Sequence, residues 1–544
     1  MKNRPKPLEV DREQIKALRD RAKRGELSVS TEDAAMIESL AETVVVLSEA
    51  VEQKSASIRR LLRLLFGAKT ESKERLFGKH KDDEDPPDGA AAEKSGSIPP
   101  KPKAKGHGRN GAAAYTGAER VSVEHPELSA GEPCPDCGRG KLRELDPSPL
   151  VHVRAQAPIT ATVYECQRLR CNTCGKVFTA PGPASAVQHK YDRSVGVMIA
   201  LLKYGSGMPF GRLENLERMA GIPLPASVQW QQVEETAAPL WPMLGALETQ
   251  AAQGQVVHND DTGMKVLELM KQRDESEAAD EGKRQRRGIF TSGIVSQVGD
   301  RRIALFRTGH RHAGENLADV LSRRCADAGI PIQMCDALSR NLPKDLEVLL
   351  ANCLGHARRG FVDLVENFPG PCRHVIEQLA VVYRNDAFTR EQEMDPDARL
   401  AYHQEHSEPV MDGLEDWCHT QLDEHIVEPN SSLGKAIRYM LRHWNALTLF
   451  LRQPGAPLDN NICERALKMA ILHRKNSMFY KTLNGARVGD LFMSLIHTCQ
   501  LNGVNALHYL QTLSDHSGKL AAAPQQWLPW NYSDTVAALD LGRI

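Results

Sequence analysis

The sequence predicts an α+β protein built from several domains. With 544 residues, the chain is too long for a single hydrophobic core. Short apolar runs typical of strands are concentrated between residues 251 and 336, whereas the segments around them carry helical patterns. A charged stretch rich in Pro and Gly, at 79–112, separates a first helical segment from the rest. We therefore expect a mixed core with flanking helical regions and a linker.

The composition narrows the class of protein. The chain is 41% hydrophobic and 26% charged, and its formal net charge is −1, so any nucleic-acid-binding surface must be local. It has no run of about 18 apolar residues, so we expect no membrane span. We expect no secretory signal either, because no apolar segment follows the basic start. Twelve cysteines, mostly scattered, suit a reducing cytoplasm.

Residues 30–66 carry a heptad pattern with one polar interruption, at Lys54. A pattern sustained over about four heptads predicts that the N-terminal segment, 1–78, pairs with a second copy in a coiled coil. The alternative is an amphipathic helix that packs on its own chain. The apolar a and d positions are Ile37, Leu40, Val44, Leu47, Val51, Ile58, Leu61 and Leu65.

The linker at 79–112 lacks the apolar residues that a core needs, so we expect it to be disordered. Its last part is basic and contains Lys103, Lys105 and Arg109 between glycines and prolines. Basic arms of this kind reach into the minor groove of DNA. A solvated tether is the alternative.

Two C-x-x-C pairs predict a zinc ribbon within residues 113–185. The pairs are Cys134 with Cys137 and Cys171 with Cys174, and a Gly follows each pair. Glycine permits the tight turn that directs backbone N–H groups at the thiolates, and four thiolates suit tetrahedral Zn²⁺. The alternative is four buried thiols.

Residues 186–250 are predicted to form a helical DNA-binding region. A helical pattern at 212–219, a turn at Gly221 and a second helical pattern from residue 226 give the outline of a helix-turn-helix. Any helical hairpin shares this outline, so a hairpin without a DNA contact is the alternative.

Residues 251–355 and 456–500 are predicted to form the α/β core. The helical segment 356–455 interrupts this core, a charged excursion occupies 273–287, and a helical segment at 501–544 ends the chain. The predicted strands are 255–260, 289–297, 302–307 and 330–335, and the predicted helices are 313–324, 491–496 and 504–513.

Three acidic residues stand where a metal-dependent nuclease core needs them. Asp260 and Asp336 end predicted strands, and Glu464 follows at the start of a predicted helix. Such positions can converge, and Mg²⁺ takes carboxylate oxygens as ligands while it keeps several waters. A pair of these ions performs in-line phosphoryl transfer on nucleic acid. Asp261 points to the opposite face of the strand from Asp260, and the pattern alone leaves open which of the two faces the metals.

Basic residues near these acids are candidate ligands for DNA phosphates. Arg358 and Arg359, together with His356, begin the helical segment, and an arginine binds phosphate through two parallel hydrogen bonds. An exposed basic helix start is the alternative. Three further basic residues, which either contact a DNA strand or line a solvated helix face, are Arg465, Arg474 and Lys475.

Several motifs together resemble transposases of the insertion sequence 66 family, which use a DDE catalytic core. The most specific motif is DNNICERA at 459–466, which contains the candidate glutamate. The remaining motifs occur in the order of the family and cover most of the chain. They are LFGAKTE at 65–71, GHGR at 106–109, the two cysteine pairs, DDT at 260–262, GHARR at 355–359, HRKN at 473–476, NGV at 502–504 and LPWN at 528–531.

The resemblance implies an RNase H-like core with a helical insert, in which Asp260, Asp336 and Glu464 form the catalytic triad and bind Mg²⁺ or Mn²⁺. It implies a bacterial, nucleoid-associated protein that binds double-stranded DNA at the element ends and at the target. Strand cleavage and strand transfer are the implied reactions. A homodimer or higher oligomer is expected, and accessory proteins encoded by the element are candidate partners.

Two other functions fit parts of the pattern. A non-catalytic DNA-binding regulator would keep the zinc ribbon and the coiled coil, and it would tolerate the loss of any of the three acids. A simple nuclease would cut DNA without joining strands.

Overall fold

The computed structural model describes residues 122, 128–133, 135, 141–143, 157–170, 177–272, 288–344 and 346–541. The chain divides into two compact units. We call Met1–Gly89 with Leu350–Asn460 the helical unit, and Ala90–Leu349 with Asn461–Ile544 the sheet unit.

Several predictions from the sequence fall outside the described residues. They concern the coiled coil at 30–66, the linker at 79–112 with Lys103, Lys105 and Arg109, the zinc ligands Cys134, Cys137, Cys171 and Cys174, and the charged excursion at 273–287.

A mixed sheet with the strand order β5-β4-β3-β6-β7 organises the sheet unit. β4 pairs antiparallel with both β3 and β5, whereas β6 runs parallel to β3. The four strands predicted between residues 255 and 335 are confirmed. The strands are β3 (Val256–Gly263), β4 (Phe290–Val298), β5 (Arg301–Gly309), β6 (Ile332–Cys335) and β7 (Leu349–Asn352), with the division between the units inside β7.

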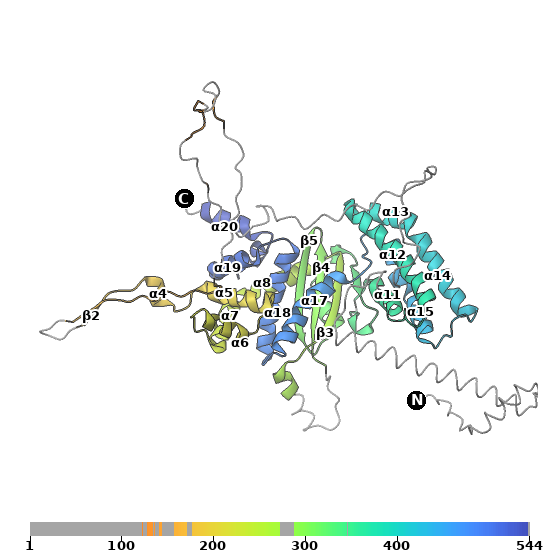
Figure 1. Ribbon diagram of the computed structural model, residues 1–544, viewed down its shortest axis with the longest axis horizontal. Coiled ribbons are helices and arrows are strands. Elements are labelled where there is room, and N and C mark those ends of the chain that lie inside the picture. The colour runs from red at the N-terminus through yellow and green to blue at the C-terminus, as the bar shows by residue number, and fades with distance from the viewer. Residues whose placement is uncertain are drawn as a thin grey trace, which may run out of the picture. The chain divides into compact units, whose positions relative to one another are not determined.

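Helices cover both faces of this sheet. α17 (Asn461–Ser477) lies across β3 and β4 on one face (Figure 1). Other side chains of β4 point to the opposite face of the sheet and form hydrogen bonds with the helices there. Ser292 accepts a hydrogen bond from Asn316 of α10 (Ala313–Leu321), and Ser296 donates one to the backbone carbonyl of Ala251 at the end of α8 (Trp241–Ala251). The strands are therefore buried on two sides, as the nearly continuous burial of β4 requires.

α18 (Leu483–Leu501) runs beside the edge strand β5 (Figure 1) and binds its backbone. Every fourth side chain of α18 and its cap accepts a hydrogen bond from every second N–H group of β5. Four residues of a helix rise about 6 Å and two residues of a strand about 6.7 Å, so the two repeats nearly match. The pairs, acceptor first, are Asp490–Thr308 (2.7 Å), Ser494–Phe306 (3.0 Å), Thr498–Ala304 (3.1 Å) and Asn502–Arg302 (3.1 Å).

The helix-turn-helix outline is present. α6 (Phe210–Met219) ends at a turn in which Gly221 has a φ of +80°, and α7 (Ala226–Ala237) follows. Glycine suits that turn because a left-handed φ costs it little. The other elements of the sheet unit are β1 (Arg168–Arg170), β2 (Val177–Thr179), α4 (Ala184–Gln188), α5 (Arg193–Ala200), η3 (Leu201–Gly205), η4 (Ala238–Leu240), η5 (Ala326–Ala328), η6 (Ser339–Asn341), α19 (Ala506–Asp515), η8 (Ser517–Lys519), η9 (Pro524–Trp527) and α20 (Tyr532–Leu541).

The described part of the helical unit is almost entirely α-helical. Asp386 is buried there and pairs with Arg399 at 2.7 Å and Arg390 at 2.9 Å, which joins α12 to α13. Within the described part of the chain, no helix has the length and apolar character that a bilayer crossing needs. The helices are α11 (Leu354–Val362), α12 (Pro369–Glu391), α13 (Pro396–His406), α14 (Glu408–Asp423), α15 (Ser432–Arg442), α16 (Trp444–Leu447) and η7 (Leu449–Leu451).

Candidate active site

In the second half of β3, two adjacent aspartates point to opposite faces of the sheet. Asp260 is paired with Gly293 of β4, on the face that α17 covers. Asp261 is paired with Ser292, on the face of α10. Only Asp260 therefore lies on the same side as the helix that carries Glu464.

Asp336 directly follows β6, the parallel neighbour of β3. In the parallel register of these strands Val256 is opposite Ile332 and His258 is opposite Met334, so two residues further along Asp336 comes beside Asp260. A shared partner joins the two acids there. Asn341 donates a short hydrogen bond from its Nδ2 to Asp336 Oδ1, and the same nitrogen lies 3.4 Å from Asp260 Oδ1.

A buried amide network holds Asn341 in place. The backbone carbonyl of Asn341 accepts hydrogen bonds from the side chains of Asn259 and Gln333, each at 2.7 Å. Gln333 also donates to Asn259 Oδ1 at 2.8 Å. All three side chains are fully buried, and the two hydrogen bonds to its backbone carbonyl hold Asn341 beside the acids. No periodicity or motif in the sequence identified Asn341.

The pKa of Asp260 is raised from 3.8 to about 7. Burial is the main cause, and the negative charges of Asp336 and Asp261 add to it. Two carboxylates crowded in a partly buried site form a donor set that a divalent cation neutralises. The residues present therefore fit a Mg²⁺ or Mn²⁺ ion on this edge of the sheet.

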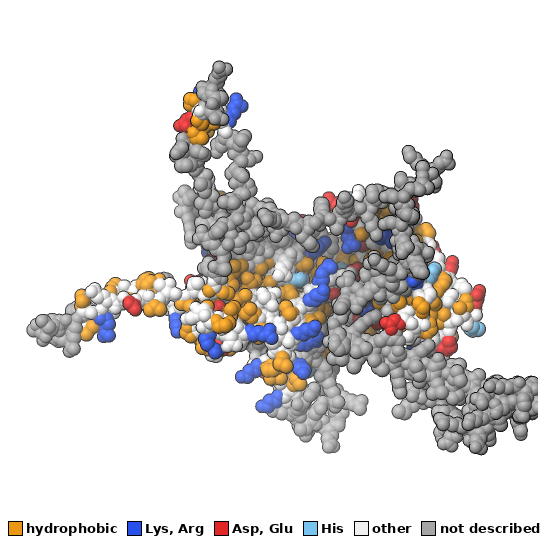
Figure 2. Space-filling view, in the orientation of Figure 1, with side chains coloured by type: hydrophobic (Ala, Val, Ile, Leu, Met, Phe, Trp, Pro, Cys, Tyr) orange, Lys and Arg blue, Asp and Glu red, His pale blue; other side chains and the backbone are white. Residues whose placement is uncertain are grey.

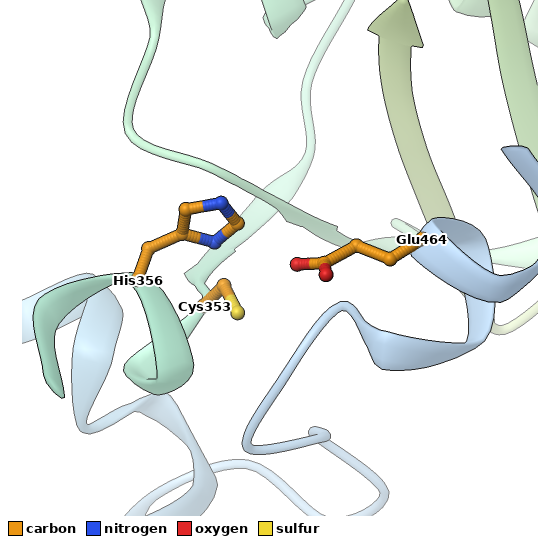
Figure 3. Close-up of side chains that lie close together, drawn as sticks. All are labelled: Cys353, His356 and Glu464. Carbon is orange, nitrogen blue, oxygen red and sulfur yellow. The ribbon is translucent and has the colours of Figure 1, made fainter. Parts of the chain in front are cut away.

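The start of α17 packs directly on the strand pair at Asp260. Cys463 donates from its thiol to the Gly293 carbonyl at 3.3 Å, and a Cβ added at Gly293 would lie 2.9 Å from Leu467. Burial raises the pKa of the Cys463 thiol, and the charges of Asp260 and Glu464 raise it further. Figure 3 shows the Glu464 side chain extending from the first turn of α17. Gly293 thus permits the close approach of the first turn of α17, which carries Glu464, to the strand pair at Asp260.

Asp261 has a different role from Asp260. Its side chain is only 1% exposed, and it is hydrogen-bonded to His312 Nδ1 at 2.9 Å. It also lies 3.4 Å from the Arg340 guanidinium. Asp261 therefore ties the start of α10 to the loop that contains Asn341. No motif or periodicity pointed to His312 or Arg340.

The basic residues predicted on α17 have different environments. Arg465 and Lys475 are exposed, and Figure 2 shows Lys and Arg side chains, with few acidic ones, over α17 and α18. Arg474 is half-buried, and its Nη1 donates to Thr262 Oγ1 at 3.2 Å and to the Gly263 carbonyl. Arg474 is thus engaged within the protein.

The helical unit contains the remaining candidates. Cys353 precedes α11 and His356 lies in its first turn (Figure 3). The backbone N–H of Asn460 donates to Cys353 Sγ at 3.3 Å, which fixes the end of this unit against the start of α11. Arg358 is half-buried and Arg359 is exposed. Of the two arginines, Arg359 is the better placed for an external phosphate.

Comparison with known families identifies the class of protein. The family described as "Transposase IS66 family" matches residues 190–488, which is 299 of 544 residues and more than half of the chain. The chain belongs to this family of transposases, which process DNA.

Three relatives come from Sinorhizobium fredii (strain NBRC 101917 / NGR234), and all three are described as uncharacterized. The protein y4hP is 25% identical over 455 residues, which cover 77% of this chain and 76% of the relative. The protein y4qI is 26% identical over 347 residues, or 61% of each chain. The protein y4jD is 35% identical over 188 residues, which cover 34% of this chain and 36% of the relative.

Proposed function

We propose that this protein is a DNA transposase that binds the ends of an insertion element, cleaves a strand there and joins the freed end to target DNA. The observation that carries the proposal is the pair Asp260 and Asp336, held at adjacent strand ends by Asn341 within the segment that matches the family. Burial and the charge of Asp336 raise the pKa of Asp260 to about 7, and such perturbed carboxylates are typical of functional sites, which favours a catalytic protein over a regulator.

We further propose that the sheet unit has an RNase H-like core. The five strands, numbered by their order in the chain, lie in the order 3-2-1-4-5, and the second strand is antiparallel to its neighbours. This is the strand order of that fold. It puts the ends of the first and fourth strands side by side, as the two aspartates require.

In the proposed reaction, water attacks a phosphodiester at the element end and releases a 3′-hydroxyl, which then attacks a phosphodiester of the target. Asp260, Asp336 and Glu464 would hold two Mg²⁺ or Mn²⁺ ions. When bound, these ions activate the attacking oxygen and stabilise the leaving oxygen. Asn341 orients the two aspartates, and the packing of α17 on Gly293 positions Glu464. The exposed Arg465 and Lys475 would bind DNA phosphates.

Strand transfer with a labelled element end, target DNA and Mg²⁺ tests the proposal. We expect Asp336→Ala to lower cleavage and joining by about a thousandfold or more, because ligands of one site act as a unit. Binding to the element end should persist, because phosphate contacts elsewhere supply most of the affinity. Asp327→Ala, at an exposed aspartate of η5, is the matched control and should behave as wild type.

Each other outcome selects a different function. Normal cleavage by Asp336→Ala would reject the proposed site. Cleavage without joining by the wild-type protein would indicate a nuclease, and specific end binding without cleavage would indicate a regulator.

A further inference from the structure

The C-terminal half of α17 is a junction between the helix-turn-helix region and the end of β3. His473 is buried, and its ring stacks between Tyr480 and Tyr204, with centroid distances of 4.2 and 6.2 Å. Asn476 donates from its Nδ2 to the Gly207 carbonyl at 3.0 Å, just before α6. The C-terminal half of α17 is therefore attached to the segment just before α6, through Tyr204 and Gly207.

Arg474 joins this junction to the catalytic strand. Its Nη1 donates to Thr262 Oγ1 and to the Gly263 carbonyl, directly after the aspartate pair of β3. Thr262 is two residues from Asp260, so the two side chains share one face of the strand. Arg474 therefore bonds the same face of β3 that carries the proposed metal ligand.

Two separate attachments thus hold α17 against the sheet. The first is the packing of Cys463 and Leu467 on Gly293, and the second is the bonding of Arg474 to the end of β3. The two contacts lie seven to eleven residues apart along the helix, so together they define its direction on β3. Glu464 adjoins the first of these contacts, and Arg474 holds the other end of the same helix.

We infer that Arg474 is a positioning residue. It keeps α17 aligned on β3, so that the carboxylates of Glu464 and Asp260 keep the relative position that binding a shared metal ion requires. The inference rests on the proposed function of these acids. The neighbouring Lys475 is exposed, so it is suited to a DNA phosphate. Adjacent basic residues of one helix thereby divide alignment and DNA binding between them.

The test compares Arg474→Ala with Lys475→Ala in the full-length protein. The affinity for a labelled element end is measured at several salt concentrations, and thermal stabilisation by Mg²⁺ and the Mg²⁺ dependence of cleavage are measured alongside. For Arg474→Ala we expect affinity within about twofold of wild type and an unchanged salt slope. The Mg²⁺ concentration for half-maximal stabilisation and cleavage should rise about tenfold or more, because misaligned ligands bind the ion weakly.

Lys475→Ala should show the reverse pattern. Its end binding weakens and the salt slope falls by about one, while its Mg²⁺ dependence is that of the wild type. If Arg474→Ala instead loses salt slope and keeps normal Mg²⁺ dependence, Arg474 is a DNA contact and the inference is overturned.

Thr262→Val removes the side-chain acceptor of Arg474 and covers the case in which Arg474→Ala fails to fold. We expect Thr262→Val to raise the Mg²⁺ requirement in the same direction and to add little to Arg474→Ala. Independent, additive effects of the two changes would overturn the inference. The Asp336→Ala experiment separates this result from a failure of the proposed function, because it tests the acids without altering α17.

Discussion

At the scale of single residues, two adjacent aspartates of β3 make opposite contributions to stability. Burial raises the pKa of Asp260 to about 7, and the negative charge of Asp336 adds to the shift. Asp261 is almost fully buried but has His312 and Arg340 as basic partners. If Asp260 binds a cation as proposed, its charge is unfavourable in the metal-free folded protein and favourable once the cation is bound, which is typical of the trade between stability and function.

Asp260→Asn should therefore stabilise the metal-free protein at pH 8. A raised pKa means that the stability linked to Asp260 is fully present below its unfolded-state pKa of 3.8 and is lost as the pH rises through about 7. Replacing the ionised carboxylate by a neutral amide should raise the free energy of unfolding at pH 8 by about 1–4 kcal/mol. Denaturant unfolding in a chelator, at pH 8 and pH 4, measures the effect, which should vanish at the lower pH.

Asp261→Asn is the matched control at the next position. It removes the acid from His312 and Arg340, so it should lower the free energy of unfolding by about 1–3 kcal/mol. Stabilisation of both variants, or of neither, would contradict the roles assigned to the two side chains.

The sequence predicted the positions of the strand-end acids but not the residues that orient them. Asp260 and Asp336 follow short apolar runs, and such runs predict strands from neighbouring residues alone. The positions of the two acids can therefore be predicted without knowing the tertiary structure. Asn341 ends the short helix η6, and its contacts with both acids depend on how the segment after β6 turns back toward the two strands. Such contacts leave no periodic trace in the sequence.

At the scale of elements, α18 replaces the missing neighbour of an edge strand. Its side chains at every fourth position bond the free N–H groups of β5. An exposed edge is otherwise a template for pairing with other chains. Asp490, the first of these side chains, is buried, and burial raises its pKa to about 7 despite two hydrogen bonds from Thr308.

Thr498→Val tests this arrangement with little change of shape. Thr498 Oγ1 accepts from the Ala304 N–H at 3.1 Å and donates to its carbonyl at 3.2 Å. Valine leaves both buried groups unsatisfied, so the free energy of unfolding should fall by about 1–3 kcal/mol. Urea denaturation of the purified protein measures the loss.

Thr249→Val provides the comparison for the same substitution. Thr249 is exposed on α8 and bonds only the carbonyl of its own helix, four residues earlier, so its replacement should change stability by less than about 0.5 kcal/mol. Equal losses for the two variants would show that the β5 bonds contribute nothing special. The sequence predicted a helix at 491–496 from its apolar residues. That pattern does not reveal that polar side chains at every fourth position bond a strand edge.

At the scale of the whole molecule, the family match covers residues 190–488, and the two cysteine pairs lie before that segment. We predict about one zinc per chain, bound by Cys134, Cys137, Cys171 and Cys174, because the two C-x-x-C pairs have the spacing of a structural site. Metal analysis of purified wild type and Cys171→Ser measures it, and the variant should lose most of the zinc.

Cys166→Ser is the control variant for this measurement. Cys166 is an exposed free cysteine close in sequence to the second pair, so Cys166→Ser should keep the zinc content of the wild type. Loss of zinc from Cys166→Ser, or its retention by Cys171→Ser, would reject the ligand set.

The arrangement of α18 on β5 also has a consequence during translation. The bonded partners are 182 to 200 residues apart, and ribosomes add about 5–20 residues per second. The outer edge of β5 therefore waits roughly ten to forty seconds for the helix that covers it. A polypeptide released before α18 is made keeps that edge open, and open edges pair with one another. Premature termination in the last part of the gene should thus yield aggregates rather than a folded fragment that competes with the intact protein for DNA.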